Sequence, residues 1–247
     1  MQRRVDMINT ELTKLYKDYW TGLRNFRKKH GLSGPLLMKL NQPKVRLFIV
    51  GHETYGGWGG TLKSLRNDYD FLLSKCLEVE PPPKEGFKEW KNIRRTYYSP
   101  FWRVVRDLNV GFGIDPNKES VAWSNLNRMD NGEKKPPYVP SYNISKEMIE
   151  SFPLLSEEIR ICKPKILVFF TVDRRLLEQT FDKVCFEKFG GFGAELLRVK
   201  IPGFKGKAYQ MNHPGYIQRR KGHGLKYNAK ELVQAILKDC KGRKTIL

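Results

Sequence analysis

The sequence predicts an α/β protein, a three-layer α/β/α sandwich around a central four-stranded, mainly parallel sheet. Two observations favour this fold class. Short runs rich in β-forming residues lie far apart in the chain, at 45–50, 120–124, 165–171 and 206–212. Helical patterns separate these runs, and strands that alternate with helices pair in parallel, with helices on both faces of the sheet.

The first element is an N-terminal helix, expected at about 7–30. Its apolar side chains recur at helical spacing, and Gly31 marks its end. The strand at 45–50 follows and leads into Gly-His-Glu-Thr-Tyr and a glycine-rich stretch around Trp58. This loop keeps a carboxylate, an imidazole and a phenol close together after a buried strand.

Further helices are expected at about 61–75, 98–108, 145–162, 172–183 and 228–240. Pro153 should break or kink the helix at 145–162. Asn228 with Glu231 resembles a capping box at the start of the last helix. The strand at 165–171 contains Lys-Ile-Leu-Val-Phe-Phe, which lacks polar alternation, as expected for a strand covered on both faces.

The 247 residues suit a single domain, 1–247, with ample length for a core. Polar, Pro-rich insertions near 78–90 and 130–142 are expected as surface connections inside this domain. No apolar run is long enough for a membrane span, and the N-terminus lacks the apolar region of a secretory signal. These features predict a cytoplasmic protein, nucleoid-associated if prokaryotic.

The cysteine spacing argues against a metal site. Cys76, Cys162, Cys185 and Cys240 are far apart, whereas metal ribbons and iron–sulfur sites need a close pair. Reduced, mostly buried thiols and no metal are therefore expected.

The net charge of +20 predicts a polyanionic partner, and nucleic acid is the commonest. The basic residues concentrate after Gly215, where only Glu231 and Asp239 oppose them. They are Arg219, Arg220, Lys221, Lys226, Lys230, Lys238, Lys241, Arg243 and Lys244.

Polar groups suited to recognition or catalysis follow three of the four predicted strands. They are the carboxylate of Glu53, the amide of Asn125 and the imidazole of His213. Ligands bind beyond the carboxyl ends of the strands in open parallel sheets. The sequence therefore predicts a site where these ends meet.

Four stretches in this order resemble the motifs of the uracil-DNA glycosylase superfamily. They are VGHETYG (50–56), VAWSN (121–125), PKILVFF (164–170) and NHPGY (212–216). The resemblance implies that superfamily's fold and a DNA glycosylase, a hydrolase of DNA repair that flips a base out of the duplex. It also implies a DNA partner, a monomer and no cofactor or metal.

Residue by residue, the resemblance implies two catalytic groups. Glu53 would position water and offset charge on the sugar, and His213 would donate to the base carbonyl. Asn125 would bind the base edge, and Tyr55 would form a pocket wall. Trp58 and Trp123 are the candidates for the aromatic residue that stacks on the base.

The resemblance also implies a DNA-binding surface. Gly56 and Gly57 would let backbone approach the nucleotide closely. Tyr216 and Ile217 would wedge into the duplex from a loop, and phosphates would meet the cations that follow. Those cations are Arg219, Arg220 and Lys221.

The chain departs from the superfamily's motifs at several positions. Glu53 stands where those proteins have Asp, Thr54 where they have Pro, and Gly215-Tyr216 where they have Ser-Pro. These departures leave open a second class of function, a nucleic-acid-binding protein on the same fold with lost or altered catalysis. A nucleotide hydrolase or transferase is the third alternative, although Gly-Gly-Trp-Gly-Gly-Thr lacks the Lys of a P-loop.

Overall fold

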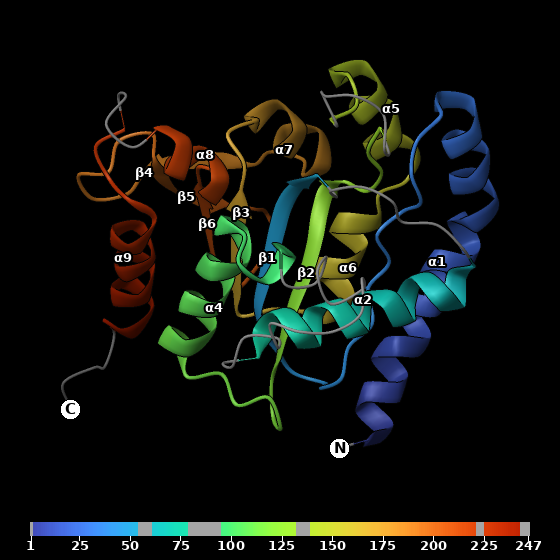
Figure 1. Ribbon diagram of the computed structural model, residues 1–247, viewed down its shortest axis with the longest axis horizontal. Helices are drawn as coiled ribbons and strands as arrows, with labels where there is room; N and C mark the ends of the chain where they lie inside the picture. The colour runs from blue at the N-terminus through green and yellow to red at the C-terminus, as the bar shows by residue number, and fades with distance from the viewer. Residues whose placement is uncertain (1, 54–60, 79–94, 132–138, 221–224, 243–247) are drawn as a thin grey trace.

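A six-stranded sheet forms the centre of the described part of the protein (Figure 1). The computed structural model describes residues 2–53, 61–78, 95–131, 139–220 and 225–242. The strands are β1 Val45–Glu53, β2 Ser120–Asn127, β3 Ile166–Phe170, β4 Cys185–Lys188, β5 Leu196–Lys200 and β6 Lys207–Met211. Their order is β2-β1-β3-β6-β5-β4. The first four in this order are parallel, and β5 runs antiparallel to both β6 and β4.

The α/β class is confirmed, but the prediction of four strands is wrong. The four predicted strands are the parallel ones, β1, β2, β3 and β6. Strands β4 and β5 extend the sheet as an antiparallel pair beyond β6. Every side chain of β4 keeps some exposure, and Cys-Phe-Glu-Lys offers no apolar run. An edge strand of this kind forms because it pairs with its neighbour. Its own sequence pattern therefore does not predict it.

The helices of the described part agree with most of the predicted ranges. They are α1 Gln2–His30, α2 Leu62–Leu77, α4 Pro100–Phe112, α5 Tyr142–Ser151, α6 Leu154–Cys162, α7 Arg174–Thr180, α8 Pro214–Arg220 and α9 Ala229–Lys241. Helix α1 ends at His30, and Gly31 follows it with a φ of +62°, which suits glycine. The predicted break near Pro153 separates α5 from α6, and Asn228 and Glu231 form the predicted capping box. Helix α8 was not predicted.

Helices cover both faces of the parallel part of the sheet (Figure 1). Helices α5 and α6 contact β2, and α9 contacts β6. Every residue of β2 and β3 is buried, which requires cover on both faces. Asn125, His52 and His213, which the sequence analysis singled out or quoted, lie at or just beyond the carboxyl ends of the parallel strands.

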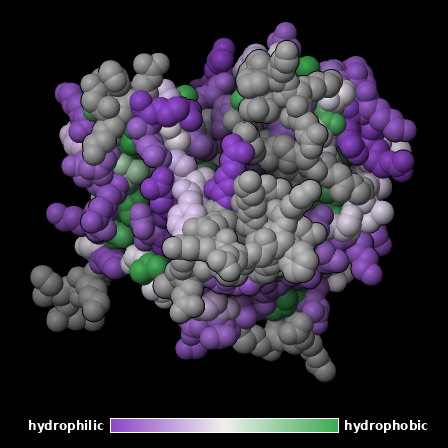
Figure 2. Space-filling view, viewed as in Figure 1, coloured by the Kyte–Doolittle hydropathy of each residue, from purple (hydrophilic) through white to green (hydrophobic). Residues whose placement is uncertain are grey.

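The predicted insertions lie largely outside the described residues. On the face shown in Figure 2 the described surface is mostly hydrophilic, with scattered hydrophobic residues. Within the described part, no helix has the length and apolar character needed to cross a membrane. All four cysteines are free, and Cys76 and Cys162 are buried as expected. Cys185 is exposed instead, because it lies on the edge strand β4.

Candidate functional site

Asn125 lies at the carboxyl end of β2, directly across from Gly51 of β1. Its side chain is completely buried. A Cβ atom at position 51 would overlap Asn125 Oδ1 and would come within 3.3 Å of Phe101 Cε2. Gly51 therefore leaves the space that the Asn125 amide occupies.

The Asn125 amide is held in one orientation by Trp123. The indole Nε1–H of Trp123 donates to Asn125 Oδ1 at 3.1 Å. Because an indole N–H can only donate, the acceptor must be the amide oxygen, and Asn125 Nδ2 is left as a donor. Nδ2 is buried and has no partner among the described residues. A buried donor without a partner costs about 1–3 kcal/mol, which a bound ligand would offset.

Trp123 is therefore a positioning residue and not a free stacking face. It is 7% exposed and packs between Tyr69 and Trp102. The prediction that Trp123 could stack on a base is corrected by this burial. The other candidate, Trp58, lies outside the described residues.

Phe101 supplies the aromatic face that the sequence analysis missed. Its ring stacks on His213 with centroids 5.9 Å apart and an interplanar angle of 25°. It also lies 6.0 Å from the Trp123 ring and close to Gly51. Phe101 is near the start of α4, which Ser99 caps and Pro100 begins. Ser-Pro-Phe is a helix-start signal, but only the tertiary fold brings this ring to the strand ends.

His213 follows β6 and is neutral at pH 7. Burial is the main cause that lowers its pKa to about 4, and electrostatic repulsion from Arg219 and from a protonated His52 adds to it. The backbone N–H of Gly215 donates to His213 Nδ1 at 3.1 Å. The proton of the neutral ring therefore resides on Nε2, which makes Nε2–H a hydrogen-bond donor.

His52 belongs to strand β1 and bonds to a side chain. Its Nδ1 lies 2.8 Å from Thr171 Oγ1, and Thr171 Oγ1 also accepts from the Asp173 backbone N–H at 3.0 Å. Burial lowers the pKa of His52, and Asp173 partly opposes that effect. His52 therefore lies within β1 and not in the predicted loop after residue 50, because β1 continues through Glu53.

Asn127 is a second buried amide on the same face of β2. It lies two residues beyond Asn125 and pairs in register with Glu53. Neither Nδ2 nor Oδ1 of Asn127 has a partner among the described residues. The sequence showed the Asn-Leu-Asn pattern, and its alternation was the available signal that both amides share one face.

Glu53 ends β1, but its side chain lies outside the described residues, as do Tyr55, Gly56 and Gly57. Lys221 and the side chain of Arg220 also lie outside them. Of the remaining predicted DNA-binding residues, Arg219 is exposed on α8 and lies near His213. Tyr216 is 39% exposed.

The predicted wedge loop is instead the helix α8. Backbone N–H groups of Tyr216 and Ile217 donate to the carbonyl of His213 and begin the helix. Ile217 is 4% exposed and packs into the core. The assignment of Ile217 to the wedge is therefore wrong, because helical periodicity turns it inward and leaves Tyr216 outward.

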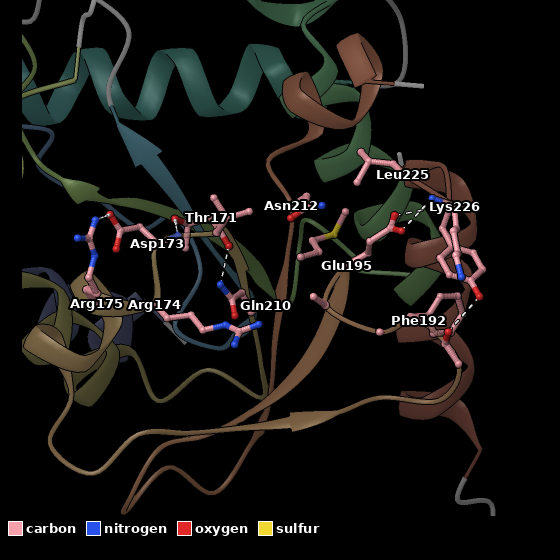
Figure 3. A pocket seen from close by; sticks show the side chains of 16 residues that line it. Thr171, Asp173, Arg174, Arg175, Phe192, Glu195, Gln210, Asn212, Leu225 and Lys226 are labelled. Atoms are coloured by element: carbon pink, nitrogen blue, oxygen red, sulfur yellow. Dashed lines mark hydrogen bonds and ion pairs between the residues drawn. The ribbon is translucent and has the colours of Figure 1, made fainter. Parts of the chain in front are cut away.

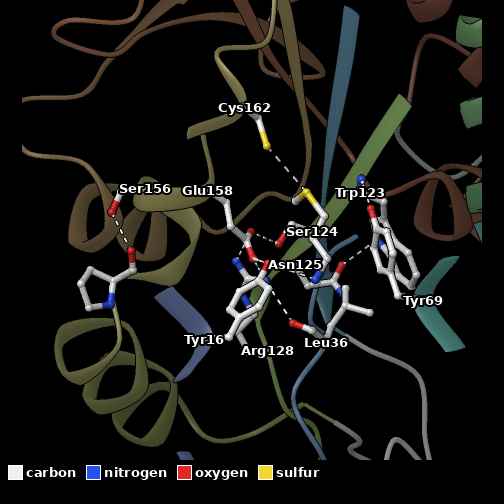
Figure 4. Close-up of polar contacts among 12 residues, drawn as sticks. Tyr16, Leu36, Tyr69, Trp123, Ser124, Asn125, Arg128, Ser156, Glu158 and Cys162 are labelled. Carbon is white, nitrogen blue, oxygen red and sulfur yellow. Dashed lines mark hydrogen bonds and ion pairs between the residues drawn. The ribbon is translucent and has the colours of Figure 1, made fainter. Parts of the chain in front are cut away.

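A buried polar cluster lies behind the site and anchors β2 (Figure 4). Arg128 and Glu158 form an ion pair that is almost completely buried. Ser124 donates to Glu158 Oε2 at 3.0 Å, and Tyr16 donates to Glu158 Oε1 at 2.6 Å. This cluster joins α1, β2 and α6, so it fixes the strand that carries Asn125 and Asn127.

No known protein-family model matches the chain, and a search of curated proteins finds no significant match. Among the described residues, no group of His, Cys, Asp and Glu is placed to hold a metal ion. The described site itself contains two buried amides, a neutral imidazole donor and an aromatic face.

Proposed function

We propose that the protein is a DNA base glycosylase that hydrolyses the N-glycosidic bond of uracil, or of another deaminated or modified base, flipped out of DNA. The observation that carries this proposal is the buried Asn125 amide with a free donor, close to the Phe101 ring that stacks on His213. A flipped base offers a flat face and a hydrogen-bonding edge, and a pocket must recognise both.

Asn125 fits the Watson–Crick edge of uracil. Its free Nδ2–H can donate to the O4 carbonyl. Its Oδ1 accepts from Trp123 with one lone pair, and the second lone pair can accept from N3–H. Phe101 would cover the face of the ring.

The charges that develop in the reaction suit His213 and Glu53. Breaking the bond between C1′ and the base nitrogen leaves positive charge on the sugar and negative charge on the base. Nε2–H of His213 would donate to the base carbonyl, and the Glu53 carboxylate would stabilise the oxocarbenium-like sugar. Water then adds to C1′ and loses a proton, and the departing base anion gains one.

The second candidate is a nucleic-acid-binding protein on the same fold with lost or altered catalysis. The specific observation in its favour is Glu53 in place of Asp. The extra methylene displaces the carboxylate by ~1 Å, and a misplacement of that size can cost ~10²-fold in rate.

Single-turnover cleavage separates the two candidates. Labelled oligonucleotides that carry uracil, hypoxanthine or xanthine are incubated with protein, and abasic sites are cleaved with alkali. A glycosylase should lose most turnover in Glu53→Gln while DNA binding persists, because the amide carries no negative charge. The exposed Glu178 supplies the control variant Glu178→Gln, which should cleave like wild type.

The outcomes differ for each candidate. Equal cleavage by Glu53→Gln and wild type would show that Glu53 is not the catalytic carboxylate. A gain of activity in Glu53→Asp over a feeble wild type would favour the binding protein. If no base is cleaved but DNA still binds, the result would also favour the nucleic-acid-binding protein.

A further inference from the structure

A cavity of about 820 Å³ adjoins the candidate site (Figure 3). We name it the Gln210 cavity. It is lined by the carboxyl ends of β3 and β6, the first turn of α7, the turn between β4 and β5, and residues 225–227. Thr171 belongs to both places, since it lines the cavity and its Oγ1 bonds to His52. The volume of the Gln210 cavity lies in the range of small-molecule sites.

Gln210 gives the cavity a buried acceptor. Its side chain is 4% exposed, and Nε2 donates to the Thr171 carbonyl at 2.8 Å. Because a carbonyl can only accept, the amide orientation is fixed and Oε1 is the atom left over. Oε1 is buried and has no partner in the described part of the chain. A ligand N–H would satisfy it.

The charges available to a ligand are positive. The Asp173 carboxylate caps α7 through Leu176 N and pairs with Arg175. The Glu195 carboxylate accepts the backbone N–H groups of Lys226 and Tyr227. Both acids that line the cavity are thus engaged by the protein.

Arg174 and Lys226 are the cations left to pair with an anion, and the Arg174 guanidinium also lies over the Phe186 ring, 5.4 Å from its centroid. Both are exposed, both line the cavity, and neither forms an ion pair with a described carboxylate. In Figure 3 they approach the cavity from opposite sides. This arrangement favours a ligand that carries phosphate.

An aromatic pair completes the lining. The rings of Phe192 and Tyr227 lie 4.7 Å apart at 61°, and the Tyr227 hydroxyl donates to the Gly191 carbonyl at 3.0 Å. The fixed rings offer an apolar wall to a flat heterocycle. The cavity therefore combines an N–H acceptor, two cations that form no ion pair with a described carboxylate, and an aromatic wall.

We propose that the Gln210 cavity is a second nucleotide-binding site. A base N–H donates to Gln210 Oε1, the base packs against Phe192 and Tyr227, and the phosphate pairs with a cation at the rim, Arg174 or Lys226. The nucleotide is either free or one residue of a nucleic-acid strand, since both present the same chemistry. This inference goes beyond the proposed function, because it requires no base cleavage.

Titration with dAMP, dCMP, dGMP and dTMP, followed by calorimetry, tests the free nucleotide. Arg174→Ala with Lys226→Ala should weaken binding at least tenfold without loss of stability, because both side chains are exposed. The double variant Lys165→Ala with Lys188→Ala removes two exposed cations outside the cavity and should stay within twofold of wild type. The loss caused by the Arg174 and Lys226 variant should persist in a His213→Ala background, which separates this cavity from the proposed glycosylase site.

A strand-borne nucleotide is tested with short single-stranded oligonucleotides by fluorescence anisotropy. Gln210→Met should weaken binding of a base-bearing strand at least fivefold and leave a matched strand of abasic analogues unchanged. Thermal melting of Gln210→Met reports whether it folds; if it does not, the Arg174 and Lys226 variant carries the test on both probes.

The proposal is supported if the free nucleotide or the oligonucleotide binds and the variants weaken that binding as described. The probe that binds identifies the source of the nucleotide. The proposal is overturned if neither probe binds, or if the Arg174 and Lys226 variant binds both like wild type. Inorganic phosphate that binds as tightly as every nucleotide would overturn it as well, because the base would then contribute nothing.

Discussion

Asn125 has a side-chain amide whose two ends meet different surroundings. Trp123 occupies one lone pair of its oxygen, and its nitrogen has no partner in the part of the chain that the structure describes. Gly51 makes room for this amide, and Phe101 lies against the same glycine. If Asn125 recognises the base, as proposed, selectivity depends on the pairing of β1 with β2, which places Gly51 opposite Asn125.

Gly51→Ala tests this arrangement. The new methyl group would overlap Asn125 Oδ1, so the amide must move and its bond to Trp123 should break. We expect a loss of ~10²-fold in single-turnover cleavage of the best base substrate, as for other misplacements of about 1 Å.

The matched control is Gly191→Ala, where the nearest atom to an added Cβ lies 3.8 Å away. It should cleave like wild type. Normal cleavage by a folded Gly51→Ala protein would show that the orientation of Asn125 is unimportant for the reaction.

His213 should make the protein less stable in mild acid. The pKa of His213 is about 4 in the folded protein and about 6.5 when unfolded, so the unfolded state binds more protons between these values. Its contribution to stability is present above pH 6.5 and is lost progressively as the pH falls to about 4. The loss should be on the order of 3 kcal/mol at most.

Two measurements check this expectation. The NMR titration of the His213 ring should have a midpoint near pH 4. The difference in unfolding free energy between pH 7 and pH 5 should be smaller in His213→Gln than in wild type. A midpoint near 6.5 would contradict the burial argument.

Helix α8, which follows His213, has one buried side and one exposed side. Its apolar residue Ile217 is buried against the core, whereas Tyr216 and Arg219 are exposed. The helix is short, so tertiary packing and the hydrogen bonds to the His213 carbonyl hold it. The two faces of α8 should therefore respond differently to substitution.

Ile217→Ala should lower the free energy of unfolding by ~2–5 kcal/mol, because it opens a cavity in the core. Tyr216→Ala should leave stability within about 0.5 kcal/mol and weaken DNA binding. Chemical denaturation and fluorescence anisotropy with a duplex measure the two effects. If Ile217→Ala weakens DNA binding but keeps the stability of wild type, Ile217 contacts DNA and its assignment to the core is wrong.

Arg219→Ala together with Arg220→Ala should weaken DNA binding without changing base preference. Cations that contact phosphate position the DNA and carry no sequence information. We expect the slope of log affinity against log salt to fall by about 1 for each phosphate contact removed. A change in which base is cleaved would contradict this assignment.

The whole molecule carries a net charge of +20, and the face in Figure 2 is mostly hydrophilic. If nucleic acid is the partner, binding releases condensed counterions. Log affinity for duplex DNA should then fall linearly with log salt, by ~0.9 for each phosphate neutralised. Anisotropy titrations between low and physiological salt measure the slope. If the affinity does not depend on salt, or if no binding occurs at low salt, the prediction of a polyanionic partner is wrong.

The sequence by itself determined the parallel strands, most helix ranges and the break near Pro153, because hydrophobic period, proline and capping signals act locally. It also marked His213 and Asn125, since polar groups after buried strands meet at one edge of a parallel sheet. It did not reveal β4, β5 or the inward side of Ile217. Short exposed strands and short helices are stabilised by neighbours that are distant in the chain.

Only the tertiary structure decided which side chains share the site. Phe101 comes from the start of α4, yet its ring stacks on His213, and Trp123 turns inward to orient Asn125. The free oxygen of Gln210 is apparent only once its nitrogen is seen on the Thr171 carbonyl. Local signals determine where a strand or helix forms, but hydrogen-bond satisfaction and ring stacking depend on segments that meet only when the chain is packed.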